Sequence, residues 1–182
     1  MQISILPMDA IISKLGNAST GFNSKLAAVA LATYGVTPFT INFPVDAKAS
    51  PTTSFFFVQL DPEAIIDSSL TKKDFMSLFV PSSDNQNFEK PRDFSGLVEV
   101  GLDVILSFLP AEMQKGNFES KHLAVEDAIT EVLQPTGQQN WGVGVVYNGE
   151  FSCQRSILIE GGNESWYQVM AWRFTFQVDI GG

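Results

Sequence analysis

The segment Val98–Phe108, with the sequence VEVGLDVILSF, decides the fold. Apolar side chains stand at every second position: Val98, Val100, Leu102, Val104, Leu106 and Phe108. Between them lie Glu99, Gly101, Asp103 and Ser107, and Ile105 is the one apolar residue of this second row. A period of two is typical of a β-strand with one buried face. The segment therefore predicts a long strand whose other face meets solvent or a partner, ending at Leu109-Pro110.

A second long strand is predicted from about Trp166 to Ile180. Its apolar row is Trp172, Phe174, Phe176, Val178 and Ile180, and its second row is Ala171, Arg173, Thr175, Gln177 and Asp179. Such a strand is either central in the sheet or an edge that needs cover. Before it, Trp141–Tyr147 leads into Asn148-Gly149, the best two-residue hairpin turn in the sequence. We therefore expect a returning strand within Glu150–Glu160.

The sequence predicts two early helices and one late one. Residues 8–15 form the first, and Asn23 or Ser24 caps a second helix that runs to Tyr34 and stops at Gly35. The late helix spans Phe118–Leu133 behind an Asn117 cap. Its apolar stripe is Phe118, Val125, Ile129, Val132 and Leu133.

The remaining segments are more irregular. Short strands are predicted at Phe39–Phe43 and Ser54–Leu60, and one or two short helices within residues 62–78. Flexible loops are expected at about residues 44–53 and 81–93, where proline or polar residues accumulate. The chain, residues 1–182, is thus predicted to be a single α+β domain, with a mainly antiparallel β-sheet packed against two or more helices.

Composition excludes several classes of protein. The sequence has 182 residues, 45% of them hydrophobic, which supplies one core and excludes a disordered protein. The longest weakly polar run, Leu26–Tyr34, is about half of a membrane-spanning helix. The start of the sequence lacks the pattern of a signal peptide. We therefore expect folding in a reducing cytoplasm.

The formal net charge is −9, so a basic nucleic-acid footprint and a polybasic membrane patch are absent. The charge is unevenly distributed. Residues 1–53 carry a net charge of +1, whereas residues 54–182 hold eight basic and 18 acidic side chains, a net charge of −10. The acidity therefore belongs to the sheet-rich part of the chain.

His122 and Cys153 are the sole histidine and cysteine. An internal disulfide and a Cys/His zinc set are thereby excluded, and a catalytic triad is strongly disfavoured. We expect His122 at the surface or boundary of the late helix. Cys153 is expected to be an inert strand residue, although Arg155, on the same side, could lower the pKa of its thiol. The sequence predicts no catalytic residue, no metal site and no cofactor.

Two groups of acidic residues could in principle form a catalytic or metal site. Glu99 and Asp103 share one face of a strand but lie ~13 Å apart at strand rise, too far to share a proton or a metal ion. The late helix carries Glu126, Asp127 and Glu131, which favour a solvated face over a cation site. Carboxylate chemistry at a small-molecule site remains a remote alternative.

The second rows of the two long strands form the most distinctive feature. Rows of mixed polarity, beside flexible loops, suit a subunit that docks into an assembly, although they also fit a small domain with one wet sheet face. The expected interface residues are Asn85, Phe88, Lys90 and Arg92 in the 81–93 loop, and Glu99, Asp103, Arg173 and Gln177 on the strands. We expect the loop to order at the contact.

The order of predicted elements resembles the small tail terminator and tail completion proteins of tailed bacteriophages, and the related minor tail and neck subunits. Three stretches carry the resemblance: FSGLVEVGLDVIL from Phe94, AVEDAI from Ala124 and WRFTFQV from Trp172. They cover roughly the C-terminal half, and they are fold patterns rather than catalytic signatures. The long insert at about residues 61–93 departs from the smallest members.

The resemblance implies a non-enzymatic structural virion protein that is made in the host cytoplasm. Its partners would be other copies of itself in a ring, commonly a hexamer, the tail tube protein and the head connector or neck proteins. The acidic balance would then keep passing DNA from adhering to the lumen. The alternative is a cytoplasmic protein-binding module that forms no ring. No sequence-specific nucleic acid and no membrane are expected as partners.

Overall fold

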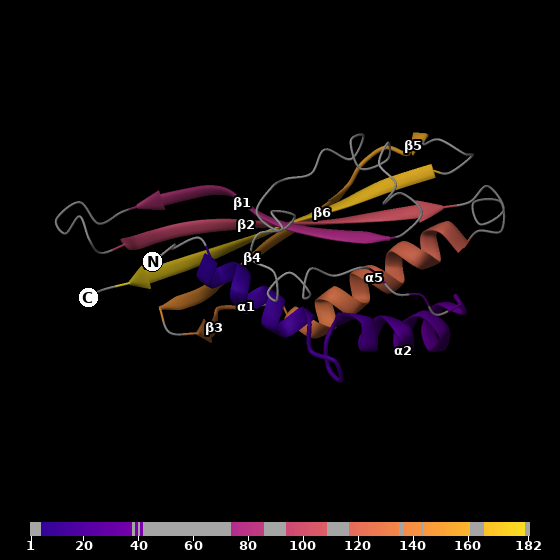
Figure 1. Cartoon of the computed structure of the whole chain (residues 1–182), viewed down its shortest axis with the longest axis horizontal. Helices are drawn as coiled ribbons and strands as arrows, with labels where there is room; N and C mark the ends of the chain where they lie inside the picture. Colours follow the sequence, from indigo (N-terminus) through magenta and orange to yellow (C-terminus); the bar gives the residue numbers. More distant parts are fainter. Residues whose placement is uncertain are drawn as a thin grey trace.

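The computed structural model describes residues 5–37, 39, 41, 74–85, 94–108, 117–134, 137–142, 144–160 and 166–180. Its elements, in chain order, are α1 (Ile5–Leu15), α2 (Phe22–Tyr34), β1 (Phe75–Asn85), β2 (Phe94–Phe108), α5 (Asn117–Leu133), β3 (Gln139–Gly142), β4 (Val145–Arg155), β5 (Ile159–Glu160) and β6 (Trp166–Ile180). Figure 1 shows the long strands in one layer and the helices gathered on one side of it. The predicted α+β class is confirmed.

β2 and β6 form the centre of the sheet. The described strands follow the order β1-β2-β6-β4-β3, β5 also pairs with β6, and every pairing is antiparallel. β2 and β6 pair along their whole length, from Phe94 opposite Ile180 to Phe108 opposite Trp166. The predicted bounds of the last strand and the predicted end of β2 at Phe108 are confirmed. β6 is a central strand, because β2 lies on one side of it and β4 on the other.

The core lies between the sheet and the helices. The apolar row of β2 is buried from Val98 to Phe108. β6 adds the buried side chains Trp172, Phe174, Phe176 and Val178. From the helix layer, α5 contributes Ala124, Val125, Ala128, Ile129 and Leu133 to the same cluster. The apolar side chains of β2 and β6, which alternate with period two, therefore pack against the apolar stripe of α5, as the sequence predicts.

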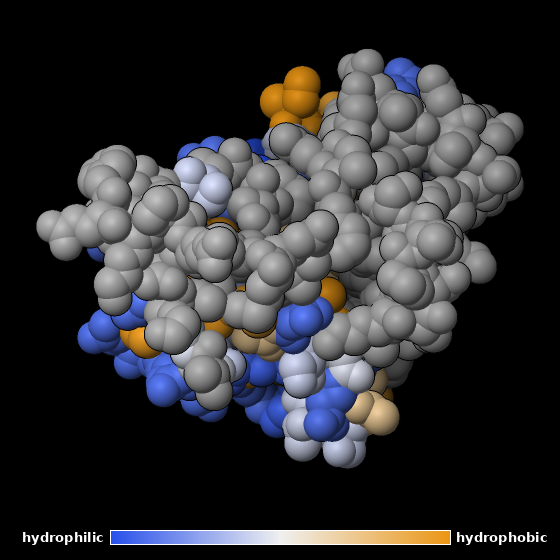
Figure 2. Space-filling view, turned by 60° about the vertical axis from the view of Figure 1, so that its left-hand side comes forward, coloured by the Kyte–Doolittle hydropathy of each residue, from blue (hydrophilic) through white to orange (hydrophobic). Residues whose placement is uncertain are grey.

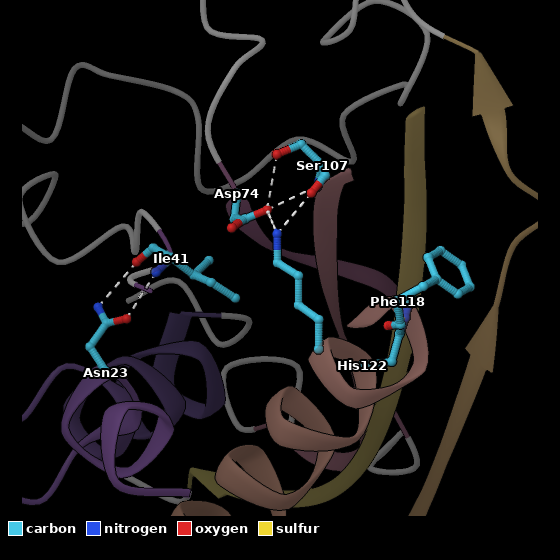
Figure 3. Close-up of polar contacts among 7 residues, drawn as sticks. Asn23, Ile41, Asp74, Ser107, Phe118 and His122 are labelled. Atoms are coloured by element: carbon cyan, nitrogen blue, oxygen red, sulfur yellow. Dashed lines mark hydrogen bonds and ion pairs between the residues drawn. The ribbon is translucent and has the colours of Figure 1, made fainter. Parts of the chain in front are cut away.

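The predicted cap of α2 is wrong, whereas its predicted end is confirmed. The helix begins directly after Gly21, which makes no side-chain capping bond, and it ends at Gly35 in the left-handed conformation (φ 65°). Asn23, expected as a cap, instead exchanges two hydrogen bonds of 3.1 and 3.0 Å with the backbone of Ile41. Ser24 also lies inside the helix. The side-chain amide of Asn23 therefore pairs with the backbone N–H and C=O of Ile41 instead of capping the first turn of α2 (Figure 3).

The predictions for residues 75–78 and 81–85 are corrected. A helix was expected at the first segment and a loop at the second, but both belong to β1, which pairs with β2. Met76 and Leu78 are both fully buried, and their spacing of two residues is that of a strand with one buried face. A short apolar run is compatible with both a helix and a strand when its sequence is considered alone, and here the pairing with β2 makes the segment a strand. The predictions for residues 42–73 and 86–93 lie outside the described residues.

The predicted hairpin turn at Asn148-Gly149 is also wrong. β4 continues through it, and the residues between Tyr147 and Phe151 bulge opposite Thr175 of β6. Gly149, at φ 82°, lies against Gly137, where a Cβ would be 2.7 Å from the Gly137 carbonyl carbon. The chain reverses instead between Gly142 and Val145, so the segment from Glu150 to Arg155 continues β4.

On the face of the molecule shown in Figure 2, hydrophilic side chains of the described residues predominate, and apolar ones appear in a few places. The large apolar side chains that stand exposed among the described residues are Leu31, Phe151 and Ile157. Within the described ranges, no helix combines the length and apolar character needed to cross a membrane.

Candidate functional site

The candidate site is the face of β2 and β6 turned away from the described helices, which we call the outer face. It comprises Glu99, Gly101, Asp103 and Ile105 of β2, and Ala171, Arg173, Thr175, Gln177 and Asp179 of β6. The antiparallel register sets Glu99 opposite Thr175 and Asp103 opposite Ala171. Four of the expected interface residues, Glu99, Asp103, Arg173 and Gln177, thus lie on two adjacent strands of one face.

An ion pair joins the two strands at the middle of the outer face. Arg173 Nη1 lies 2.8 Å from Asp103 Oδ1 and also donates to the carbonyl of Trp172 at 2.7 Å. Asp103 is only 6% exposed. Burial raises the pKa of its carboxyl, and the Arg173 hydrogen bond and charge act in the opposite direction. The pair holds β2 to β6 diagonally, a role that the sequence did not predict for either residue.

The outer face changes character along the strands. Toward one end it is apolar and buried, with Ile105 opposite Val169 and Tyr167 opposite Ser107. Toward the other end, Glu99, Thr175 and Gln177 are half-buried. The polar half is therefore the part open to solvent. Sequence reasoning missed Tyr167 and Val169, although their alternation with Trp166 and Gln168 places them in the second row.

Of the loop residues expected at the interface, only Asn85 belongs to the described part of the chain. Asn85 is the last residue of β1 and pairs with Gly96 of β2. Phe88, Lys90 and Arg92 lie outside the described residues. The described structure thus places Asn85 in the same sheet as the outer face.

A second polar cluster lies at the end of β2 (Figure 3). Lys121 Nζ lies 2.9 Å from Asp74 Oδ1 and donates to the Ser107 carbonyl at 2.8 Å. Asp74 also accepts hydrogen bonds of 2.8 and 3.2 Å from the backbone and hydroxyl of Ser107. The ammonium lies 4.9 Å from the ring centroids of both Phe39 and Phe108. Both charged side chains are buried, so this cluster joins α5 to β1 and β2.

Sequence reasoning missed this cluster, although a signal was present. Lys121 is three residues after Phe118 and four before Val125, which places a charge on the apolar stripe of α5. A lysine at such a position requires a buried partner. Only the tertiary structure identifies that partner as Asp74.

His122 is fully buried, which corrects the expected surface or boundary position. Its Nδ1 donates to the Phe118 carbonyl at 2.8 Å, and its ring lies against those of Phe108 and Phe118. Nε2 has no hydrogen-bond partner among the described residues. Burial lowers the pKa of the imidazole, so the ring is neutral at pH 7. His122 follows Phe118 by about one helical turn, so it lies on the same apolar face of α5 and is directed into the core.

Cys153 lies on β4 beside Arg155, as its spacing implies. Burial, with a smaller contribution from Glu126, raises the pKa of the thiol to about 11, although Arg155 acts to lower it. Arg155 itself binds two carboxylates of α5, Glu119 at 2.7 Å and Glu126 at 3.3 Å. The thiol is therefore protonated at neutral pH, and Arg155 ties β4 to α5.

The acidic residues of α5, expected as a solvated face, take part in contacts between elements. Glu131 forms an ion pair with Lys25 of α2, and Asp127 accepts a hydrogen bond from the hydroxyl of Tyr34. That hydrogen bond is the main cause of the raised pKa of Tyr34. Within the described ranges, no group of three His, Cys, Asp or Glu side chains could hold a metal ion.

No family model matches the sequence, and no curated protein matches it significantly.

Proposed function

We propose that the protein is a structural virion subunit, a tail terminator or tail completion protein that forms a ring, caps the tail tube and joins it to the head connector. The supporting observation is the outer face. Two strands of 15 residues pair along their whole length. Toward the Glu99 end of β2, they present polar, half-buried side chains on the face away from the helix layer. A regular face of this kind, fixed by the Asp103–Arg173 pair, is suited to repeated contacts between identical subunits.

The internal use of reactive side chains supports the same proposal. His122 is buried and neutral, Cys153 is protonated, and Lys121 is engaged with Asp74. Each of these groups holds elements of the fold together or fills its core. In a subunit whose role is assembly, such side chains serve the rigidity of the docking faces.

The charge of the chain supports a place around a DNA channel. The net charge of −10 over residues 54–182 would repel the phosphate backbone of passing DNA. In the proposed ring, acidic side chains line the lumen.

The experiment is light scattering behind a sizing column over a wide concentration range, with negative-stain images of each peak. The proposal expects closed rings, with hexamers as the commonest class. Rings whose acidic side chains all face outward would contradict the proposed lumen. A monomer at every concentration would raise the second candidate to equal standing.

The second candidate is a cytoplasmic protein-binding module without a ring. It is favoured by Phe151 of β4 and by Ile157, two large apolar side chains that stand exposed to solvent. A one-to-one complex with a different protein, in place of self-association, would identify this function.

A further inference from the structure

Among the described strands, the second half of β4, Phe151–Arg155, has a neighbour on one side only, and we call its other side the β4 edge. On one side it pairs with β6, from Phe151 opposite Phe174 to Arg155 opposite Met170. β3 covers the other side only along Val145–Tyr147. Beyond the bulge, none of the described strands lies against the free side of Phe151–Arg155.

The hydrogen-bond phase of the ladder shows which backbone groups point away from the sheet. Bonded and non-bonded pairs alternate along an antiparallel ladder. The Ser156 N–H donates to the Val169 carbonyl at 2.8 Å and continues the register of β4 with β6. Ser152 and Gln154 therefore direct their backbone groups toward β6. Phe151, Cys153 and Arg155 direct their N–H and C=O groups outward, where an added strand would meet them.

Two of the devices that prevent strand addition, proline and lysine, are missing from the β4 edge. Its sequence, FSCQR, contains no proline and no lysine, and its one charged residue, Arg155, is engaged by Glu119 and Glu126. Phe151 is 42% exposed and stacks on Trp172, and Ile157, just past the edge, is 83% exposed. Apolar contacts are thus available beside the outward backbone groups.

The charge around the edge defines the partner. Glu150 stands exposed directly before the β4 edge, and Glu160 stands exposed in β5, five residues after Arg155. The partly exposed carboxylates of Glu119 and Glu126 on α5 are bound by Arg155 of the edge. Arg155 is the only basic side chain among these five residues. Antiparallel pairing with the same edge of a second copy would bring these glutamates together, which is unfavourable.

We propose that the β4 edge binds an extended, basic segment of a partner protein by β-strand addition. The backbone groups of Phe151, Cys153 and Arg155 pair with the added strand, Phe151 and Ile157 contact its apolar residues, and the surrounding glutamates bind its lysines or arginines. This surface is separate from the outer face, so the inference does not rest on ring formation.

The probe is a nine-residue fluorescent peptide in which lysine alternates with valine or threonine, followed by fluorescence anisotropy at low salt. The expected result is saturable binding that weakens at least tenfold when glutamate replaces lysine. Cys153→Pro removes the central outward N–H at an edge position where proline is tolerated, and roughly a tenfold loss of affinity is expected. Cys153→Ala is the matched control, because it keeps the N–H and binds as the wild type does.

A second measurement needs no variant and covers misfolding of Cys153→Pro. Peptides with N-methyl groups at alternate residues cannot donate hydrogen bonds from one edge, and one of the two methylation patterns should abolish binding to the wild-type protein. Equal binding of lysine and glutamate peptides, or binding that survives both methylation patterns, would overturn the proposal. So would a wild-type dimer that Cys153→Pro converts to monomer, since the occupant would then be a second copy.

Discussion

Lys121 and His122 are adjacent on α5 and both are buried, but Lys121 has polar partners whereas His122 lies among aromatic rings. Lys121 forms an ion pair with Asp74 and donates a hydrogen bond to the Ser107 carbonyl. His122 is kept neutral in an aromatic pocket formed with Phe108 and Phe118. Their different surroundings lead to two separable predictions.

We expect the stability of the protein to fall as the pH drops through the range in which an unfolded histidine titrates, around 6.5. The folded-state pKa of His122 lies below that value, so protons bind preferentially to the unfolded chain in this window. In His122→Phe, an aromatic ring fills the same pocket without titrating. Urea midpoints at pH 7.5 and 5.5 should therefore differ less for His122→Phe than for the wild type. An equal difference in both proteins would show that other groups cause the pH dependence.

Lys121→Met should lower the free energy of unfolding by about 3 kcal/mol or more, because it leaves the buried Asp74 carboxylate without its ammonium partner. Lys25→Met is the matched control on the partly exposed pair with Glu131, where the expected cost is under about 1 kcal/mol. Urea denaturation of both variants measures the contrast. Similar costs at the two sites would show that burial does not govern the strength of these ion pairs.

At the scale of elements, strong periodicity was a reliable guide and local turn chemistry was not. The alternation in Val98–Phe108 and Trp166–Ile180 predicted β2 and β6 because each strand is long enough to carry its own pattern. Asn148-Gly149 has ideal hairpin chemistry but forms a bulge, since β4 continues along β6. Residues 81–85 form a strand without an apolar pattern, because β2 provides their partner.

The candidate site was predictable to a similar degree. Glu99, Asp103, Arg173 and Gln177 share a face because alternation fixes which way a strand residue points. The pairing of Asp103 with Arg173 was not predictable, because the two residues are 70 positions apart in sequence and meet only through the register of β2 with β6. Burial of one end of the outer face depends on tertiary contacts in the same way.

The reversal between β3 and β4 depends on Gly144. It has a φ of 71°, and a Cβ there would lie 2.1 Å from the backbone oxygen of Asp179. Gly144→Ala should therefore cost at least about 1–2 kcal/mol, the penalty of the left-handed conformation alone. Gly142→Ala, where a Cβ would meet open space, should change stability by less than about 0.5 kcal/mol. Thermal unfolding of the two variants tests this, and equal melting temperatures would refute the role of Gly144.

At the scale of the whole molecule, the helices lie on one side of the sheet (Figure 1). The polar half of the outer face belongs to the other side, because its residues alternate with the core row of β2 and β6. If the proposed ring forms through the outer face, Glu99→Lys should raise the concentration needed for assembly by roughly tenfold, because a reversed charge disturbs a repeated contact. Leu31→Lys, at an exposed position of α2, is the control and should assemble as the wild type does. Light scattering at matched concentrations measures both. Loss of assembly in Leu31→Lys alone would move the interface to the helices.

The central place of β6 has a consequence for how the chain folds during synthesis. β6 is translated after every other described element, yet β2 and β4 both pair with it. Until β6 leaves the ribosome, β2 and β4 both lack the strand with which they form backbone hydrogen bonds. Contacts between segments so distant in sequence form slowly, so the emerging chain exposes unpaired strands throughout translation. Pausing of the ribosome before Trp166, or truncation there, should leave a chain that recruits chaperones.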